Sequence, residues 1–292
     1  MTGQRNLPGI GALVAAAALF ALMDAGMKLL SPVYPAMQVT ALRSLASLPL
    51  VYGYVALRGS RAALLQIRWP LHLLRGTLGT FMLWLFILGL RTLPMTETYA
   101  IFFIAPLLIT ALSAPLLGER VGGARWLAII AGFIGVLVVL RPTGEGMLTF
   151  AGLAILGSAL CYTVSALIIR IAGRTDSTES LMFWLITMLA VASSALALPA
   201  WQAVRVQDYW LIGGIGISGF FGQLGVTYAF QHGEASAVAP FEYTALGWGV
   251  LFDRVLWHTS PDRYTLLGAT IIIASGWYLV RREKTHTEAE HP

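Results

Sequence analysis

The sequence predicts an all-α integral membrane protein whose ten transmembrane helices form two five-helix repeats of inverted topology. Composition is the first indication: the 292 residues are 57% hydrophobic and 11% charged, whereas soluble domains carry about 25% charged residues. The mean hydropathy of +0.74 agrees with a membrane protein. The other two indications are a series of apolar runs of membrane-spanning length and a match between the two halves of the chain.

Apolar runs recur along the whole chain. Each is close to the roughly 20 residues that a helix needs to cross about 30 Å of hydrocarbon. The stretch LAIIAGFIGVLVVL (127–140) is apolar on every side, as expected of a helix packed within a membrane. Connections are short, so no second, soluble domain is available. We expect helices at 9–30, 36–57, 70–90, 95–116, 124–140, 150–171, 180–200, 210–231, 236–257 and 263–280.

The two halves of the chain align with each other at a separation of 140 to 142 residues. Gly76 then falls on Gly216, and Gly135 falls on Gly276. Each half holds five expected helices. Because five is odd, the second half must be inverted relative to the first, as in many secondary transporters. We expect the first repeat at residues 1–145 and the second at 146–292, together forming one membrane domain.

Positive residues in the loops predict the orientation, because cytoplasmic loops are enriched in Lys and Arg. With both termini in the cytoplasm, the inner segments hold eleven such residues and the outer segments five. The net charge of +5 is then an inner-leaflet bias and does not indicate nucleic-acid binding. The inner set is Arg5, Arg58, Arg61, Arg68, Arg120, Arg125, Arg170, Arg174, Arg281, Arg282 and Lys284, and the outer set is Arg91, Arg141, Arg205, Arg254 and Arg263.

Several chemistries lack their sequence signals. Cys161 is the single cysteine and fits no metal-ligand spacing. The stretch GIGISG (214–219) spells a dinucleotide fingerprint, but no strand precedes it and its flanks are apolar membrane sequence. No nucleophile elbow and no ATP-binding loop is present. We therefore expect no enzymatic activity, no cofactor, no metal and no nucleic-acid partner.

The first repeat ends with APLLITALSAPLLGER (105–120) and WLAIIAGFIGVLVVLR (126–141), and the second ends with LLGATIIIASGWYLVRRE (266–283). This pattern resembles the EamA-like branch of the drug/metabolite transporter (DMT) superfamily over essentially the whole chain. One departure is that His258 and Thr259 stand where the first repeat has Gly118 and Glu119. The resemblance implies a ten-helix carrier in the bacterial cytoplasmic (inner) membrane, with both termini cytoplasmic and a central cavity. Bacterial amino-acid exporters are the members it resembles most.

Charged residues inside the expected helices are candidates for function, because a charge at the bilayer centre costs at least about 2.5 kcal/mol. Asp24 and Lys28 lie four residues apart and so share one helical face, and Arg43 lies at a similar depth on the second helix. A pair of Asp24 with Lys28 or Arg43 would lock the two helices together. The alternative is a role for these three residues in gating or in binding a zwitterion.

Glu242 is predicted to lie about 6 Å from the bilayer midplane, since it is four residues from the middle of its helix. Pro240 breaks that helix, because proline removes a backbone donor and clashes with the preceding turn. We interpret Glu242 as a cavity residue that binds a substrate amine or a proton. The alternatives are a protonated Glu242 buried in protein, or a carboxylate hydrogen-bonded to a neighbour such as Tyr243.

Pro106 predicts a similar break in the fourth helix, shortly after Tyr99 and Phe103. Aromatic and polar residues from several helices would give a central cavity apolar walls and a few polar groups. Ordinary packing or contact with lipid is the alternative for each of them. The proposed cavity set is Trp84, Tyr99, Phe103, Tyr162, Gln223, Thr227, Glu242, Tyr243 and Trp248.

These features predict a secondary transporter that exports amino acids or similar small metabolites by alternating access. A membrane-embedded lipid-handling protein and a channel for another small metabolite are the alternatives. The expected partners are a small-molecule substrate and membrane lipid, with H⁺ as an optional coupling ion. The substrate, the direction of transport, and whether the protein is a monomer or a homodimer stay open at this stage.

Overall fold

The computed structural model describes residues 3–58, 64, 67–117, 123–140, 149–172, 175–232 and 239–290, and all regular elements within these ranges are helices. The α-helices are α1 (Gly3–Leu30), α2 (Ala36–Arg58), α3 (Trp69–Leu90), α4 (Met95–Phe102), α5 (Ala105–Leu117), α6 (Gly123–Leu140), α7 (Phe150–Ala172), α8 (Thr178–Ala197), α9 (Tyr209–His232), α11 (Thr244–Leu256) and α12 (Arg263–Glu290). Three short 3-10 segments are η1 (Leu198–Ala200), η2 (Val206–Asp208) and η3 (Ala239–Tyr243).

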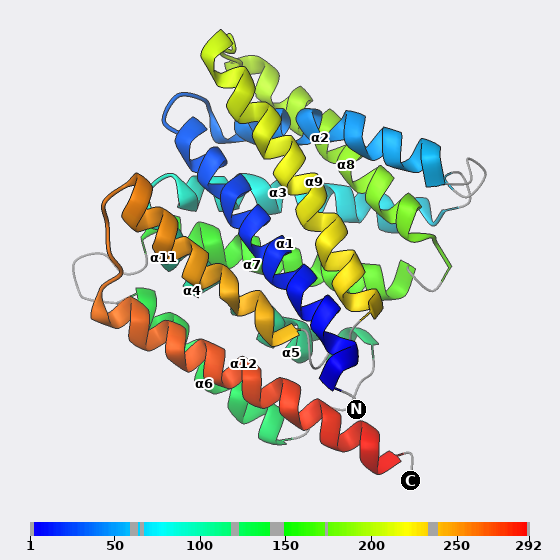
Figure 1. Cartoon of the computed structure of the whole chain (residues 1–292), viewed down its shortest axis with the longest axis vertical. Helices are drawn as coiled ribbons and strands as arrows, with labels where there is room; N and C mark the ends of the chain where they lie inside the picture. Colours follow the sequence, from blue (N-terminus) through cyan, green and yellow to red (C-terminus); the bar gives the residue numbers. More distant parts are fainter. Residues whose placement is uncertain are drawn as a thin grey trace.

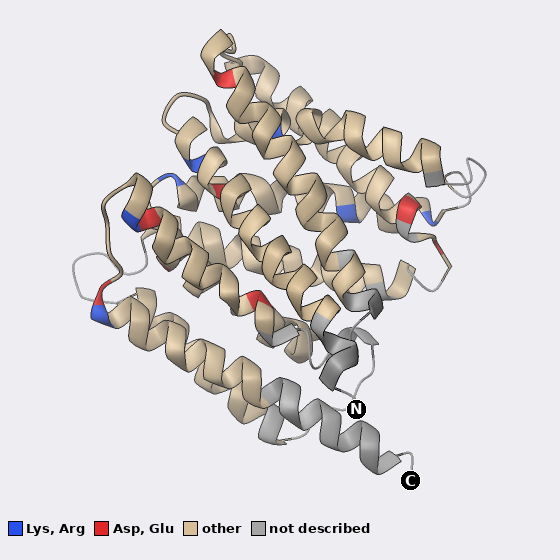
Figure 2. Cartoon of the chain, in the orientation of Figure 1, with Lys and Arg blue, Asp and Glu red and all other residues tan. Residues whose placement is uncertain are grey.

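Membrane-spanning character is clear in the described part of the chain. Seven helical segments there are long and apolar enough to cross a membrane, and the shorter stretch Trp126–Leu140 is also apolar. Charged residues are sparse along the middle of the helices and more frequent near their ends (Figure 2). The expected all-helical membrane architecture is therefore found. The count of ten spans stays a prediction.

Helices from the two halves of the chain pack in pairs (Figure 1). The most extensive contacts join α1 to α9, α3 to α7, α2 to α8 and α6 to α12. In the view of Figure 1, α2 and α8 lie at the top, α6 and α12 lie at the bottom, and the other helices lie between them. Residues distant in sequence are thereby brought together near the centre of the molecule.

Two of the expected helices are interrupted close to their prolines. α4 ends at Phe102 and α5 begins at Ala105, so the interruption falls just before Pro106. Pro106 then occupies the first turn of α5, where a missing N–H costs nothing. In the described part of the ninth expected helix, the 3-10 segment η3, which contains Pro240, precedes the α-helix α11, which begins at Thr244.

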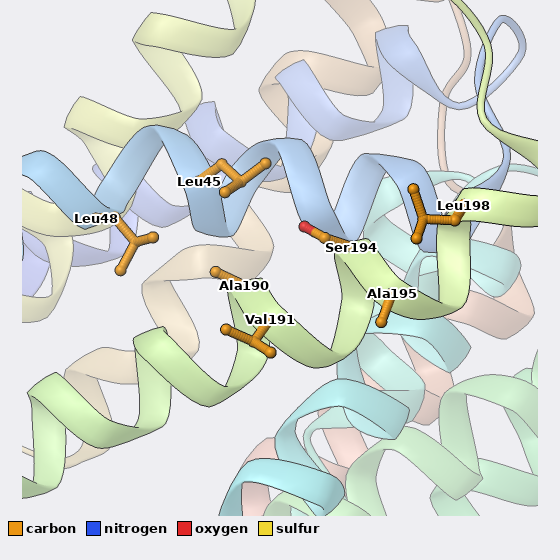
Figure 3. A pocket seen from close by; sticks show the side chains of 7 residues that line it. All are labelled: Leu45, Leu48, Ala190, Val191, Ser194, Ala195 and Leu198. Carbon is orange, nitrogen blue, oxygen red and sulfur yellow. The ribbon is translucent and has the colours of Figure 1, made fainter.

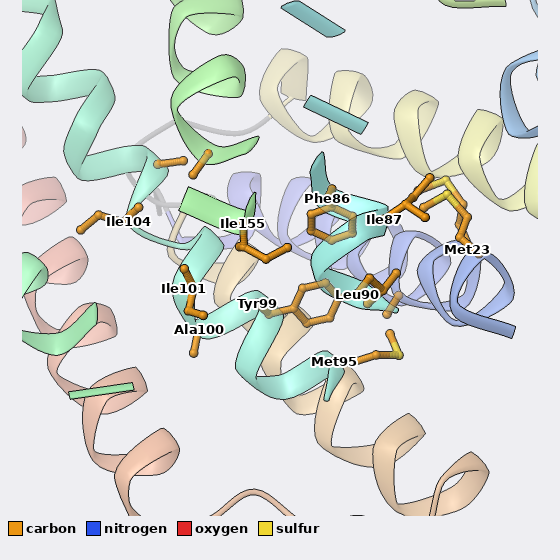
Figure 4. Close-up of a cluster of buried hydrophobic side chains, with 14 of the residues drawn as sticks. Met23, Phe86, Ile87, Leu90, Met95, Tyr99, Ala100, Ile101, Ile104 and Ile155 are labelled. Atoms are coloured by element: carbon orange, nitrogen blue, oxygen red, sulfur yellow. The ribbon is translucent and has the colours of Figure 1, made fainter. Parts of the chain in front are cut away.

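A single large cluster of buried apolar side chains occupies the centre. It draws on α1, α2, α3, α4, α5, α6, α7, α9 and α12. In Figure 4, the ring of Tyr99 lies among Phe86, Leu90 and Met95. Because lipid tails are as apolar as these side chains, close packing rather than exclusion of water holds such helices together.

α6 and α12 approach each other most closely at two glycines. A Cβ atom added to Gly268 would lie 2.5 Å from the carbonyl oxygen of Gly135, and one added to Gly135 would lie 2.9 Å from that of Gly268. Both distances are shorter than real Cβ contacts allow. The close crossing therefore requires both glycines, as is common between membrane helices.

Candidate functional site

The two interrupted helices meet at their aromatic residues. The ring of Phe103, which lies between α4 and α5, contacts the ring of Tyr243 at the end of η3, with centroids 5.1 Å apart. The ring of Tyr99 stacks on Phe103 at 6.3 Å. The sequence analysis proposed Tyr99, Phe103 and Tyr243 as residues of one cavity. In the structure their rings lie in a row, with Phe103 in contact with the other two.

Asp24 is the buried acidic group beneath this aromatic cluster. Its side chain is 7% exposed, and Oδ2 accepts a hydrogen bond of 2.8 Å from the hydroxyl of Tyr99. The positive charge of Arg43 also acts on Asp24. Arg43 Nε contacts Met23 Sδ at 3.2 Å. Asp24 thus connects α1 to α4 through Tyr99, and the charge of Arg43 on α2 is its electrostatic partner.

Lys28 does not pair with Asp24, which corrects one of the expected pairings. Its Nζ lies 3.8 Å from Oδ1 of Asp253 on α11 and donates a 2.5 Å hydrogen bond to the carbonyl oxygen of Leu93. It also lies 4.7 Å from the ring centre of Trp257. One helical turn separates Lys28 from Asp24, and the chain fold supplies each of them with a different partner.

Asp253 joins the end of α11 to the start of α4. It is 1% exposed and accepts three hydrogen bonds of 2.8 Å, from the backbone N–H groups of Met95 and Thr96 and from the Thr96 hydroxyl. The first N–H groups of a helix lack partners within the helix, so an acidic side chain that caps them is stabilising. We call Asp253, Lys28, Met95 and Thr96 the α4–α11 clamp.

Glu242 lies in η3 and is partly buried. Its charge acts on both Tyr243 and Tyr162. Tyr162, on α7, in turn contacts the ring of Phe102 at 5.4 Å. These residues come from three separate helical segments, η3, α7 and α4.

Tyr162 lies on the side of α7 opposite to the exposed residues Leu153 and Leu160. Leu153 and Leu160 are about half exposed, and Tyr162 and Ile169 each follow one of them by nine residues. Nine residues at about 100° each place a residue on the opposite side of a helix. Tyr162 and Ile169 are nevertheless 38% and 39% exposed. α7 thus has two exposed faces, and the second one carries Tyr162, which contacts Phe102.

Tyr243 is held in place by a glycine of α12. A Cβ atom added to Gly276 would overlap the Tyr243 hydroxyl oxygen and lie 2.8 Å from Cζ. A larger residue there would have to displace the tyrosine ring or the helix. Gly276 therefore makes room for Tyr243 beside Phe103.

Two other predicted cavity residues pack on the central apolar cluster. Trp84 contacts Phe81 on its own helix, at 6.1 Å, and packs on the central cluster, as Trp248 does. Gln223 is exposed on α9. The side chains of Thr227 and Pro240 lie outside the described residues.

Asp253 and Arg75 are among the buried charged residues that sequence reasoning missed. Asp253 lies in the last turn of α11, and the signal was an acid within an apolar run, LFDRV (251–255). Arg75 lies on the buried face of α3. The sequence feature that indicates it is an arginine at the start of RGTLGT (75–80), a stretch in which only the glycines had been interpreted. Among the described residues, no group of His, Cys, Asp and Glu is arranged to hold a metal ion.

A buried His–Asp pair stands near the start of α3. His72 Nε2 lies 2.9 Å from Oδ2 of Asp176, which precedes α8. Burial by itself raises the pKa of Asp176. Hydrogen bonds from Thr175, His72 and the Arg68 backbone lower this pKa by a larger amount, so it lies below its ordinary value. The pair fastens α3 to the connection between α7 and α8.

A pocket of about 390 Å³ lies between α2 and α8 (Figure 3). Its lining is almost wholly apolar: Leu45, Leu48, Ala190, Val191, Ser194, Ala195 and Leu198. Leu45, Val191 and Leu198 are exposed. The pocket is therefore a shallow groove on the apolar surface, separate from the Glu242 region.

Membrane-spanning helices, two proline-associated interruptions and buried charges at their junction define a polytopic membrane protein of the transporter class. The chain matches the EamA-like transporter family twice, over residues 7–141 and 149–281, and it belongs to that family. A crystal structure of a protein with 19% sequence identity shares the fold, with a TM-score of 0.63 over 97% of this chain and 99% of the other.

Curated relatives carry several different transport functions. A riboflavin transporter of Vibrio cholerae is 28% identical over 88% of this chain and 86% of its own length. A pseudopaline exporter of Pseudomonas aeruginosa is 25% identical over 94% and 97%. An S-adenosylmethionine uptake transporter of Rickettsia prowazekii is 28% identical over 85% and 82%. The chain is therefore a membrane transporter and not an enzyme.

Proposed function

We propose that this transporter exports amino acids or similar small metabolites from the cytoplasm by alternating access around the junction of the two interrupted helices. One observation carries the proposal: Glu242 lies in the 3-10 segment η3 next to Tyr243, whose ring contacts Phe103 at the α4–α5 interruption. Irregular backbone is tolerated at membrane depth only where it is buried in protein or lines a water-filled cavity.

The proposed architecture is ten spans in two inverted repeats, at residues 1–145 and 146–292. The family match to each half separately supports this division. The helix pairing supports it too: α1 packs on α9 and α7 packs on α3, so the first helix of each half contacts the third helix of the other. α2 with α8 and α6 with α12 are pairs of equivalent helices, as a two-fold relation requires.

The proposed location is the bacterial cytoplasmic membrane, with both termini in the cytoplasm. The excess of Lys and Arg in the segments assigned to that side supports this orientation. Figure 1 marks both chain ends at the same corner of the molecule, as an even number of spans requires.

In this orientation the structure fits a state that is closed on the outside. The α4–α11 clamp seals the end where α4 begins and α11 ends, through the buried carboxylate of Asp253. The second exposed face of α7, from Tyr162 to Ile169, runs toward the opposite, cytoplasmic end. Substrate would reach Tyr162 and Glu242 from the cytoplasm, and opening the clamp would release it outside.

Outward transport is a proposal about this chain, because the relatives differ in direction. One is named as an exporter and another as an uptake transporter. Their substrates differ as well, so amino-acid specificity rests on the site, which offers a carboxylate and aromatic hydroxyl groups to a small polar ligand. Coupling to H⁺ through Glu242 or Asp24 is part of the same proposal.

The test is efflux from liposomes that contain the purified protein and a panel of labelled amino acids. Native protein, Glu242→Gln and the exposed control Arg254→Gln are compared at equal amounts of folded protein. We expect saturable efflux from native protein and from the control, and a loss of at least tenfold in Glu242→Gln. No efflux of any amino acid would refute the proposed substrate class, and unchanged efflux in Glu242→Gln would remove this residue from the pathway.

A further inference from the structure

Arg75 is a charged residue that the proposed function has not used. It lies on the buried face of α3, and its side chain is 8% exposed. Nη1 donates a 2.6 Å hydrogen bond to the carbonyl oxygen of Leu181 on α8, whereas the buried Nε has no hydrogen-bond partner in the described part of the chain. A buried donor left unpaired is costly and needs an explanation.

Arg75 also lacks a counter-ion among the residues that the structure describes. Neither the Lys28–Asp253 ion pair nor the His72–Asp176 contact found there includes Arg75. A guanidinium cannot lose its charge under ordinary conditions. A buried and unpaired charge is strongly destabilising, so buried cations are normally matched by an anion. An anion that arrives with the substrate would meet this requirement.

Arg75 and Glu242 share one neighbour. The charges of both residues act on Tyr162, and Tyr162 lies on the partly exposed inner face of α7. Arg75 is six residues from the start of α3, or about 9 Å along the helix. It therefore lies in the same half of the proposed membrane domain as the interruption that holds Glu242. A cation from α3 and an acidic group from η3 thus both act on one tyrosine of α7.

We propose that the Arg75 guanidinium binds the carboxylate of a small zwitterionic substrate while Glu242 binds its ammonium group, with Tyr162 between them. This inference rests on the proposed transport function and names the chemical class that the site selects. Arg75 would be the residue that requires a carboxylate, because its planar donors match a carboxylate and form charge-assisted hydrogen bonds. The same substrate without its carboxylate would leave the buried cation unmatched.

A structural role is the competing explanation, since Arg75 also links α3 to α8 through Leu181. Arg75→Gln separates the two roles: its amide still offers a donor for a helix-to-helix hydrogen bond, but it has no charge. A purely structural Arg75 would affect all ligands alike. A carboxylate-binding Arg75 would affect only ligands that carry a carboxylate.

The experiment measures ligand binding by the thermal stabilisation of purified protein, because a ligand that binds the folded state raises its unfolding temperature according to its Kd. The probes are the protein amino acids, each compared with its α-carboxamide and its N-acetyl derivative. The proteins are native, Arg75→Gln, Arg75→Lys, Glu242→Gln and the exposed control Arg254→Gln. The same proteins are then tested for flux in liposomes.

For native protein and the control, we expect at least one amino acid to bind about tenfold or more tightly than its carboxamide, the factor that a charge-assisted hydrogen bond supplies. Arg75→Gln should bind the two equally, and Arg75→Lys should keep a reduced preference. Glu242→Gln should still bind an amino acid more tightly than its carboxamide. It should no longer bind the amino acid more tightly than its N-acetyl derivative.

Equal binding of every amino acid and its carboxamide to native protein would overturn the inference, without need of any variant. An Arg75→Gln variant that still prefers amino acids over their carboxamides would also overturn the inference. The same holds if Arg75→Lys weakens the binding of all ligands equally. Selective binding without flux would instead refute the transport proposal and leave the ligand assignment standing. Flux of ligands that lack a carboxylate, at rates equal to the amino acids, would refute the ligand assignment alone.

Discussion

Removal of the Asp253 side chain is predicted to be the most damaging single change in the α4–α11 clamp. Asp253→Ala deletes three buried hydrogen bonds of 2.8 Å and the partner of Lys28 at 3.8 Å. Breaking a buried ion pair by removing one member costs about 3–5 kcal/mol, because the other charge stays buried. The loss of the helix cap is the smaller effect, at about 0.5–2 kcal/mol.

The assay is thermal unfolding of the purified protein in detergent, followed by tryptophan fluorescence. A loss of 3–5 kcal/mol corresponds to a fall in Tm of roughly 6–20 °C at about 2–4 °C for each kcal/mol. The matched control is Arg254→Ala, because Arg254 is the next residue and is exposed. We expect the control to stay within about 0.5 kcal/mol of native protein. An unchanged Tm in Asp253→Ala would refute the reasoning about the clamp.

Three further predictions concern single sites. Gly276→Ala should displace Tyr243 and lower amino-acid efflux several-fold while the protein stays folded; normal efflux would show that the Tyr243 position is unimportant. Gly135→Ala should separate α6 from α12 at Gly268 and lower the free energy of unfolding by about 1–3 kcal/mol, measured by thermal unfolding. The pKa of Asp176 is lowered in the folded state. Ionised Asp176 therefore stabilises the fold at pH values above its ordinary pKa of 3.8, and this stabilisation is lost as the pH falls through the lowered pKa. The Tm difference between native protein and Asp176→Asn should be constant from pH 5 to about pH 7 and should shrink below about pH 4; a difference that grows on acidification would contradict this.

The sequence was most informative about features that depend on composition and on proline. Long apolar runs predicted membrane helices, and the described helices begin and end within a few residues of most predicted bounds. Pro106 marked the α4–α5 interruption because proline fits the first turn of a helix without loss, whereas in the interior it removes a backbone hydrogen bond. These signals are local, so a single sequence contains them.

Partner choice was harder to predict, because it depends on how helices pack. Asp24 and Lys28 lie on one helical face, which favoured a pair between them. In the fold, α4 brings Tyr99 to Asp24, and α11 brings Asp253 to Lys28. The closeness of Arg75 to Tyr162 likewise requires α3 to pack on α7, which the spacing of residues within α3 does not indicate.

The measurement that tests the account most directly is exchange across liposomes that contain the purified protein. Vesicles are loaded with a labelled amino acid that the protein transports, and the exit of label is followed with and without excess unlabelled amino acid outside. Alternating access predicts that exit saturates with internal concentration and accelerates when external substrate is added, because substrate returns the carrier to its inward-facing state. Exit that rises linearly with concentration and is not accelerated would contradict the account and indicate a channel.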